Sequence, residues 1–193
     1  EEFLRRNIGI DAVFRGEGEE FLGQWLPICH EKGKWSDVKG LCFILDGNYI
    51  DCGKAVVSDF ASLRYPEESP FFVSDRSFVQ LETTRGCFNS CQFCVSGADK
   101  PVRSLSIEQI RSRLNYFEKK NIKSIRMLDR TFNGSTKRCK EMLDLMTEYN
   151  GRLTFHLEIH PSLLKGELRD ELNKMPKGLL HLEAGIQSLH DEV

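Results

Sequence analysis

The sequence lacks a long hydrophobic run, a marked excess of one charge, and any internal repeat or low-complexity tract. No apolar stretch approaches the roughly 20 residues that a membrane-spanning helix needs. Lys and Arg number 27 and Asp and Glu number 29, so the formal net charge is −2 and nothing indicates attraction to nucleic acid or to an acidic membrane surface. We therefore expect neither a nucleic-acid partner nor a membrane partner.

Cysteine is present in an odd number, seven, and no secretory signal pattern precedes it. This combination argues against a disulfide framework and favours a reducing compartment, with cytoplasm as the default, and metal or redox chemistry. The first residue is Glu1 rather than Met, and both ends resemble interrupted helices. We expect the chain to be a piece of a longer protein.

The first third of the chain has an irregular pattern. The β-rich run 8–14 leads through a Gly-containing turn into a short helical pattern, which predicts an α/β crossover. Two further β-rich runs flank Asp46-Gly47-Asn48 and predict a hairpin. Residues 53–76 contain two prolines and keep no sustained period, as is typical of a linker.

From Phe78 onward strands and helices alternate. The hydrophobic periods predict strands over 78–84, 122–129, 153–160 and 179–188, and helices over 106–120, 136–149 and 162–175. Ser106 and Gln109 are spaced as a capping box at the start of the first helix. The βαβαβαβ order predicts an α/β fold with a parallel sheet and right-handed crossovers.

The predicted strands carry polar residues on alternate positions, which is unusual for parallel strands. In the third strand Phe155, Leu157 and Ile159 alternate with polar residues that include His156 and Glu158. An antiparallel sheet with one solvated face would also give this pattern, but the intervening helices argue against it. The pattern favours a polar cavity, such as the interior of a TIM-type barrel or half-barrel that opens on an active site.

Three cysteines gather directly after the first strand of this series. Cys87, Cys91 and Cys94 form a C-x3-C-x2-C run. A structural zinc site or an ordinary electron-transfer cluster usually takes four protein ligands, and Cys139 is placed on the apolar stripe of a predicted helix, where a structural thiol is expected. Three thiolates instead suit a 4Fe–4S cluster in which one iron has no protein ligand.

With this motif the chain resembles the radical S-adenosylmethionine enzymes. The resemblance implies a cytoplasmic enzyme whose Cys87, Cys91 and Cys94 bind a 4Fe–4S cluster, which reductively cleaves S-adenosylmethionine to a 5′-deoxyadenosyl radical for C–H activation. It further implies a reductant such as flavodoxin or ferredoxin, and it places Phe93 beside the adenine of S-adenosylmethionine. The alternative is a cysteine-rich zinc or iron–sulfur module for electron transfer or scaffolding, without radical catalysis.

Several segments are similar to the cobalamin-associated subclass of these enzymes. "DAVFRGEGEEFLGQWL" resembles the segment that joins a Rossmann-like cobalamin-binding domain to the barrel, and "LDRTFN", "FHLEIHP" and "EAGIQS" resemble barrel segments. The resemblance implies a remnant of the cobalamin-binding domain over 1–28, a hairpin and linker over 29–77, and about four βα units of a partial (βα) barrel over 78–193. Cobalamin, and the methyl transfer for which it could serve, would belong to the full-length parent.

The resemblance also suggests further residues that bind S-adenosylmethionine. Either Asp129 or Asn133 would contact the amino group, and Glu158 with Gln187 or Ser188 would approach the ribose or carboxylate. A buried ion pair with a partner such as Arg126 is the structural alternative for Glu158. For the three histidines on the predicted strands, and for the cysteines outside the motif, we expect structural roles: His156, His160, His181, Cys29, Cys42, Cys52 and Cys139. The substrate is left unassigned.

Overall fold

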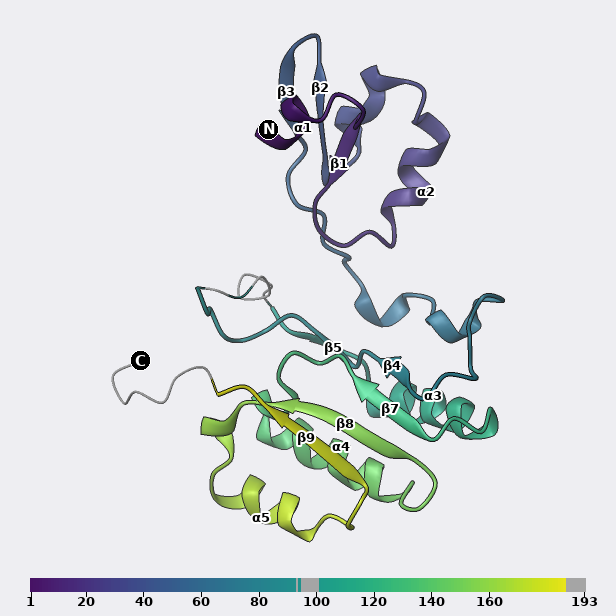
Figure 1. Cartoon of the computed structure of the whole chain (residues 1–193), viewed down its shortest axis with the longest axis vertical. Helices are drawn as coiled ribbons and strands as arrows, with labels where there is room; N and C mark the ends of the chain where they lie inside the picture. The colour runs from purple at the N-terminus through teal and green to yellow at the C-terminus, as the bar shows by residue number, and fades with distance from the viewer. Residues whose placement is uncertain (93, 95–100, 187–193) are drawn as a thin grey trace. The chain divides into compact units, whose positions relative to one another are not determined.

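The computed structural model describes residues 1–92, 94 and 101–186. The chain divides into two compact units, Glu1–Leu63 and Arg64–Val193 (Figure 1). The predicted divisions after residues 28 and 77 differ from this boundary. In the part of the chain that is described, no helix has the length and apolar character needed to cross a membrane.

The first unit contains a three-stranded antiparallel sheet in the order β1 (Ala12–Phe14), β2 (Leu41–Leu45), β3 (Asn48–Asp51). The predicted hairpin is confirmed: Leu45 pairs with Asn48, and positive φ values at Asp46 and Gly47 make the two-residue turn. The helical elements of this unit are short: α1 (Glu2–Arg6), α2 (Phe21–Trp25), η1 (Leu26–Ile28), η2 (Lys32–Asp37) and η3 (Phe60–Ser62).

The α/β crossover predicted at the start of the chain is wrong. β1 runs antiparallel to β2, with Val13 opposite Cys42, instead of joining a parallel neighbour. The helix that follows β1 is only five residues long and continues into 3-10 turns, so the chain returns in the opposite direction. A Rossmann-like character of residues 1–28 is therefore not shown.

A ladder of aromatic rings forms the core of the first unit. Successive ring centroids are 4.0 to 5.8 Å apart along the series Phe14, Phe21, Trp25, Trp35, Phe43. Trp35 and Phe43 are fully buried with Val38 and Leu41. Aromatic pairs of this kind add about 0.5–1.5 kcal/mol each beyond the area that they bury, so this small unit has a core of its own.

The GEGE turn in the first unit requires its first glycine. Gly16 has a φ of +111°, and a Cβ at this position would lie 2.1 Å from the carbonyl oxygen of Ala55. The close approach allows Ala55 N–H to donate to Arg15 O and Glu17 N–H to donate to Ala55 O. The Glu17 carboxylate also accepts a bond of 2.7 Å from Val57 N–H. The turn is thus held to residues 55–57.

The second unit contains the predicted parallel sheet, in the order β4 (Val79–Leu81), β7 (Ser124–Met127), β8 (Thr154–Ile159), β9 (Leu180–Ala184). The three predicted helices are present between these strands (Figure 1). They are α3 (Ile107–Lys119), α4 (Thr136–Thr147) and α5 (Gly166–Lys174). Because the strand order follows the chain order, right-handed crossovers place all three helices on one face of the sheet.

Burial alternates along β4, β7 and β8 as the sequence predicts, but not along β9, where every residue after Leu180 is exposed. Phe155, Leu157 and Ile159 of β8 are buried, whereas His156 and Glu158 are half-buried. The same alternation occurs in β4 and β7, where buried aliphatic residues flank Gln80 and Arg126. Buried residues of α3 and α4 complete the core: Ile110, Leu114, Phe117, Cys139, Met142, Leu143 and Met146. The predicted capping box at Ser106 and Gln109 is also confirmed.

The end of the predicted linker packs on α3. Arg113, on the buried side of α3, forms a bidentate ion pair with Glu67 of η4 (Pro66–Glu68), with distances of 2.5 and 2.8 Å. The Tyr65 ring lies 4.4 Å from the guanidinium of Arg113, and Gln109 donates to the Tyr65 hydroxyl. These contacts explain why the second unit begins at Arg64.

Candidate functional site

The three motif cysteines follow β4 on a segment whose two ends are joined. After β4 the chain forms β5 (Thr84–Arg85), and it returns through β6 (Arg103–Ser104), which pairs antiparallel with β5. Leu105 N–H adds a bond of 2.9 Å to Thr83 O. We call residues 83–85 and 103–105 the loop base. The cysteine-bearing segment therefore begins at the carboxyl end of the first parallel strand, as the sequence predicts.

Asp129, which follows β7, binds the loop base with its whole carboxylate. Oδ1 accepts from Thr83 N at 2.7 Å and from Thr84 N at 2.9 Å, and Oδ2 accepts from the Thr83 hydroxyl. Burial raises the pKa of Asp129, while these hydrogen bonds act in the opposite direction. In this structure the side chain holds two strand ends together rather than pointing toward a ligand.

The three motif thiols differ in exposure. Cys87 is buried, and its sulfur lies 3.9 Å from the Thr131 hydroxyl oxygen, whereas Cys91 and Cys94 are exposed. Cys94 N–H donates to Cys91 O at 3.1 Å, so a tight turn separates these two residues. Phe93, predicted to lie beside adenine, is outside the described residues.

Among the described residues, no group of three or more His, Cys, Asp and Glu side chains lies close enough together to hold a metal ion. The donor set nevertheless fits an iron–sulfur cluster, because three thiolates on one short segment are the soft ligands that such a cluster takes. It fits a closed zinc site poorly, since a fourth ligand is missing from the segment and Cys139 is fully buried in α4. Burial raises the pKa of Cys139 to about 12, which keeps this thiol protonated.

Asn133, in η5 (Phe132–Gly134), is buried and bonded through both ends of its amide. Its Nδ2 donates to His160 O at 3.0 Å, and its Oδ1 accepts from His160 N at 2.8 Å. The side chain therefore joins the segment after β7 to the end of β8. A contact with S-adenosylmethionine stays a prediction for Asp129 and Asn133, and either contact would require these bonds to rearrange.

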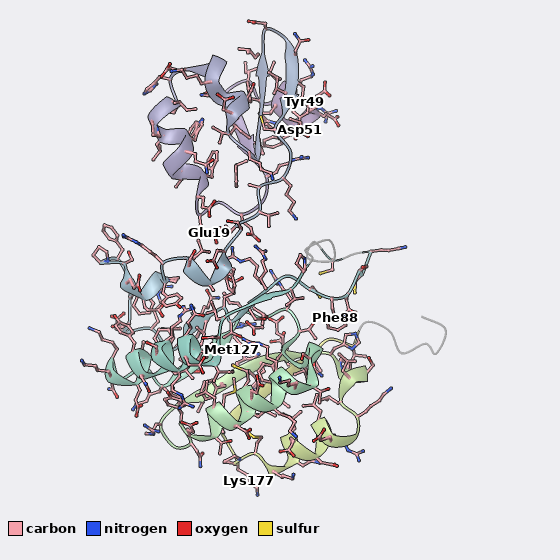
Figure 2. The ribbon with its side chains drawn as sticks, turned by 180° about the vertical axis from the view of Figure 1, so that it is seen from behind. Glu19, Tyr49, Asp51, Phe88, Met127 and Lys177 are labelled. Carbon is pink, nitrogen blue, oxygen red and sulfur yellow. The ribbon has the colours of Figure 1, made fainter. Side chains whose placement is uncertain are left out.

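The sequence analysis missed Phe88, the residue after the first cysteine. Its side chain is labelled in Figure 2. The ring packs over Gly134, where a Cβ would lie 2.9 Å from the ring edge, and its centroid is 6.4 Å from that of His160. Gly134 is thus required by close approach. In the sequence, Gly134 simply follows "TFN", and nothing in that pattern indicates a contact with Phe88.

The polar face of the sheet carries a cluster of charged residues. Arg126 lies 3.4 Å from the Glu183 carboxylate and 4.0 Å from that of Glu158. The ring nitrogen Nε2 of His156 is 2.8 Å from Glu183 Oε2. His181 lies beside His156, with ring centroids 4.7 Å apart. The cluster is half-exposed, so it can meet a polar ligand at modest desolvation cost.

Two expectations about this face have different outcomes. The prediction that Glu158 lies opposite the helix-covered Leu157 is confirmed, and the ion pair between Glu158 and Arg126 is present, although it is half-exposed. The alternation predicted along the strand over 179–188 would place Ile186 on the apolar face beneath the helices, and this expectation is wrong, because its side chain is 72% exposed. β9 ends at Ala184, and coverage of this strand decreases along its length. Gln187 and Ser188 lie outside the described residues.

Two of the three strand histidines have local polar partners, and a structural role stays a prediction for all three. His156 pairs with Glu183, and the imidazole Nδ1 of His160 is 2.8 Å from the Ser162 hydroxyl.

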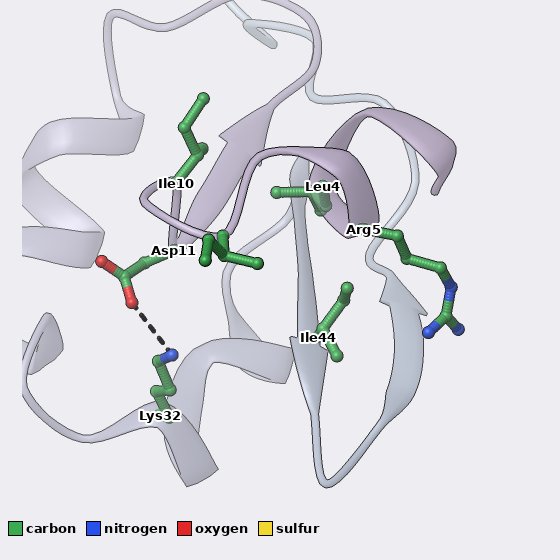
Figure 3. Close-up of a pocket in the computed structure, with 7 residues that line it drawn as sticks. Leu4, Arg5, Ile10, Asp11, Lys32 and Ile44 are labelled. Atoms are coloured by element: carbon green, nitrogen blue, oxygen red, sulfur yellow. Dashed lines mark ion pairs between the residues drawn. The ribbon is translucent and has the colours of Figure 1, made fainter.

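A pocket of about 360 Å³ is present in the first unit, where the Asp11–Lys32 ion pair borders apolar side chains (Figure 3). It contains none of the predicted site residues.

Comparisons with known proteins agree with this geometry. Residues 81–193 match the model of the Radical SAM superfamily, where SAM is S-adenosylmethionine. A curated relative, ribosomal protein uS12 methylthiotransferase RimO from Petrotoga mobilis, is 25% identical over 130 residues, which is 63% of this chain and 30% of the relative. The chain thus spans about a third of the length of this relative.

Solved structures show the same fold. The radical S-adenosylmethionine methyltransferase TsrM from Kitasatospora setae, described with a tryptophan substrate and a SAM analogue, superposes with a TM-score of 0.74 at 18% identity. The match covers 98% of this chain and 40% of TsrM. The cobalamin-dependent S-adenosylmethionine radical enzyme OxsB gives a TM-score of 0.69 at 20% identity, over 89% of this chain and 26% of OxsB. The second unit therefore has the fold of the partial barrel in these enzymes.

Proposed function

The chain belongs to the radical SAM superfamily, and from this premise we propose that Cys87, Cys91 and Cys94 bind a 4Fe–4S cluster for radical catalysis. The observation that carries the proposal is the C-x3-C-x2-C run at the carboxyl end of β4, where its ends are joined by β5 and β6. Three protein thiolates leave one position of such a cluster open to a small molecule.

When bound, a cluster of this kind supplies one electron for the reductive cleavage of S-adenosylmethionine into methionine and a 5′-deoxyadenosyl radical. The protein binds the cluster through the three thiolates and orients the substrates on the polar face of the sheet.

We assign the proposed contacts to S-adenosylmethionine first to Glu158, which lies on the polar face and is half-exposed. Phe93, Gln187 and Ser188 remain proposed neighbours of its adenine, ribose or carboxylate. Asp129 and Asn133 rank behind them, because their side chains already bind backbone groups of the loop base and of β8.

For the protein as a whole we propose C–H modification, with cobalamin-dependent methyl transfer as its leading form. The similarity of fold to TsrM, described with cobalamin and a 4Fe–4S cluster, and to OxsB supports this choice. We further propose a cytoplasmic enzyme that receives electrons from a flavodoxin or ferredoxin. The other candidate is a cysteine-rich zinc or iron–sulfur module for electron transfer or scaffolding, without radical catalysis.

Anaerobic reconstitution tests the proposal. The wild type should bind about four iron and four sulfide per chain, and with dithionite it should form methionine from S-adenosylmethionine. Cys91→Ala should lose both properties. Cys139→Ala is the matched control and should keep the cluster, because burial keeps that thiol protonated. A full cluster in Cys91→Ala would contradict the proposal, and a bound cluster without methionine would favour electron transfer.

A further inference from the structure

The two ends of the cysteine-bearing segment meet at a single buried residue, Thr83. Its carbonyl oxygen accepts from Leu105 N–H, and its amide and hydroxyl both donate to Asp129. Cys87 follows Thr83 by only four residues. Any displacement of Thr83 would therefore be passed to the first cysteine through a short stretch of chain.

Arg138 binds both sides of the loop base at once. This residue lies in the first turn of α4, and its guanidinium donates from Nη1 to Leu105 O at 3.0 Å and from Nη2 to Thr83 O at 3.3 Å. Two donors in one rigid plane fix the spacing of the two carbonyls, which a lysine with one flexible ammonium cannot do equally well. α4 thereby holds the segment closed from one side.

Asp129 holds the same residues from the other side. The Asp129 carboxylate accepts from the amides of Thr83 and Thr84, whereas the Arg138 guanidinium donates to the Thr83 carbonyl. Groups of opposite charge therefore bind the amide and the carbonyl of Thr83. The charge of Asp129 raises the pKa of Arg138, while burial lowers it and has the larger effect. The segment that carries Asp129 also carries Thr131, the hydroxyl neighbour of the Cys87 sulfur.

We propose that Asp129 and Arg138 are positioning residues, which hold the loop base closed and thereby set the environment of the iron–sulfur cluster through Cys87. This inference rests on the cluster of the proposed function. Neither side chain touches the cluster or S-adenosylmethionine in this role. Their effect reaches the cluster through the backbone from Thr83 to Cys87 and through the contact between Thr131 and Cys87.

Hydrogen exchange on the 193-residue chain tests the closed loop base without a cluster. In Arg138→Met, the amides of Thr84, Arg85, Arg103 and Leu105 should exchange about tenfold faster or more, because each side of the base loses a bond to a charged group. Amides in α5 should keep their rates. Arg138→Lys should give an intermediate change, since it retains the charge and a single donor.

Arg152→Met is the matched control. Like Arg138, Arg152 donates to a backbone carbonyl, that of Glu148, and it additionally pairs with the Glu118 carboxylate, but it lies far along the chain from the loop base. Its removal should leave exchange at the loop base unchanged. Should Arg138→Met fail to fold, Arg138→Lys and Thr83→Val, which removes only the hydroxyl donor to Asp129, supply the same comparison.

The reconstituted chain tests the effect on the cluster. In Arg138→Met, iron should be lost to a chelator about tenfold faster than in the wild type, and the electron paramagnetic resonance spectrum of the reduced cluster should change, whereas Arg152→Met should match the wild type. Unchanged exchange at the loop base, or an unchanged spectrum and rate of iron loss in Arg138→Met, would overturn the inference. A wild type without iron would contradict the proposed function and the cluster part of this inference. The exchange rates alone would then support or overturn the closed loop base.

Discussion

At the scale of single residues, Asp129 shows two opposed effects on one carboxylate. Burial favours its protonated form, and hydrogen bonds from Thr83 and Thr84 favour its charged form. Burial is the larger effect, so the pKa of Asp129 in the folded chain is raised above the ordinary value of 3.8. The residue that fixes the loop base is therefore also sensitive to pH.

This raised pKa predicts how stability depends on pH. A group with a higher pKa in the folded state contributes stability that is fully present below its unfolded pKa and is lost as pH rises through its folded pKa. The free energy of unfolding of the wild type, relative to Asp129→Asn, should therefore fall as pH rises from the ordinary value of 3.8 through the raised pKa of the folded chain. Urea unfolding of both proteins across this range measures the difference.

Asp170→Asn is the control for this comparison, because it removes an aspartate that is exposed on α5. Its free energy of unfolding is measured against that of the wild type over the same pH range. If the relative stability of the wild type rose with pH, the hydrogen bonds would outweigh burial. Asp129 would then be a stabilising anion rather than a group that is ionised at a cost.

Residue types and spacing predicted part of this site. The cysteine motif, and the opposite faces of Leu157 and Glu158, follow from local pattern, because sequence spacing alone determines them. Apart from the Thr83 hydroxyl, the partners of Asp129, Asn133 and Arg138 are backbone groups between 27 and 55 positions away along the chain. Backbone groups carry no sequence signature, so these bonds could not be inferred from the residues.

At the scale of elements, a buried ion pair fastens residues 65–67 to α3. Arg113 is among the buried residues of its helix, although a charged residue would be expected on the solvent side. Its guanidinium binds Glu67, lies over Tyr65 and also donates to Glu82 O at 3.3 Å. One side chain thus connects η4, α3 and the residue that precedes the loop base.

Breaking this pair should destabilise the second unit strongly. Glu67→Gln keeps the shape of the side chain but leaves Arg113 as a buried charge without its counter-ion, at a cost of about 3 kcal/mol. Glu148→Gln is the matched control, because its partner Arg111 forms an exposed pair on the same helix, and this change should have little effect. Chemical unfolding followed by circular dichroism measures both. Equal effects would show that the buried pair contributes no more than the exposed one.

The order and type of the four parallel strands and three helices in the second unit were predictable, since the helices are strongly periodic and the strand segments are rich in apolar residues at alternate positions. The direction of β1 was not. A short strand followed by a turn and a helical pattern can lead to either a parallel or an antiparallel partner strand. Which of the two forms depends on how far the helix extends. α2 contains five residues, and the chain returns beside β1 through 3-10 turns that have no clear period.

At the scale of the whole molecule, each unit has its own core. The aromatic ladder lies entirely within residues 14–43, and the sheet and helices of the second unit enclose another set of buried residues. The sequence separated an irregular first part from a regular second part. Its expected divisions fell after residues 28 and 77 rather than after Leu63, and the buried pair that joins Glu67 to Arg113 is encoded by two isolated charged residues that give no sign of where the second unit begins.

Separate cores predict separate unfolding, and the positions of the tryptophans make this measurable. The chain has two tryptophans, Trp25 and Trp35, and both belong to the aromatic ladder of the first unit. Tryptophan fluorescence therefore reports on the first unit, whereas far-ultraviolet circular dichroism reports mainly on the three helices of the second. During denaturation the two signals should give transitions with different midpoints.

Two variants identify which transition belongs to which unit. Gly16→Ala should lower only the fluorescence midpoint, since a Cβ would strike Ala55 O and the positive φ is strained, at a cost on the order of 1–3 kcal/mol or more. Gly53→Ala is its control, because that glycine also has a positive φ but no atom within 4 Å of the added Cβ. Glu67→Gln should lower only the circular dichroism midpoint. Coincident transitions that both variants shift equally would mean that the chain unfolds as one cooperative body, and the two cores would then depend on each other.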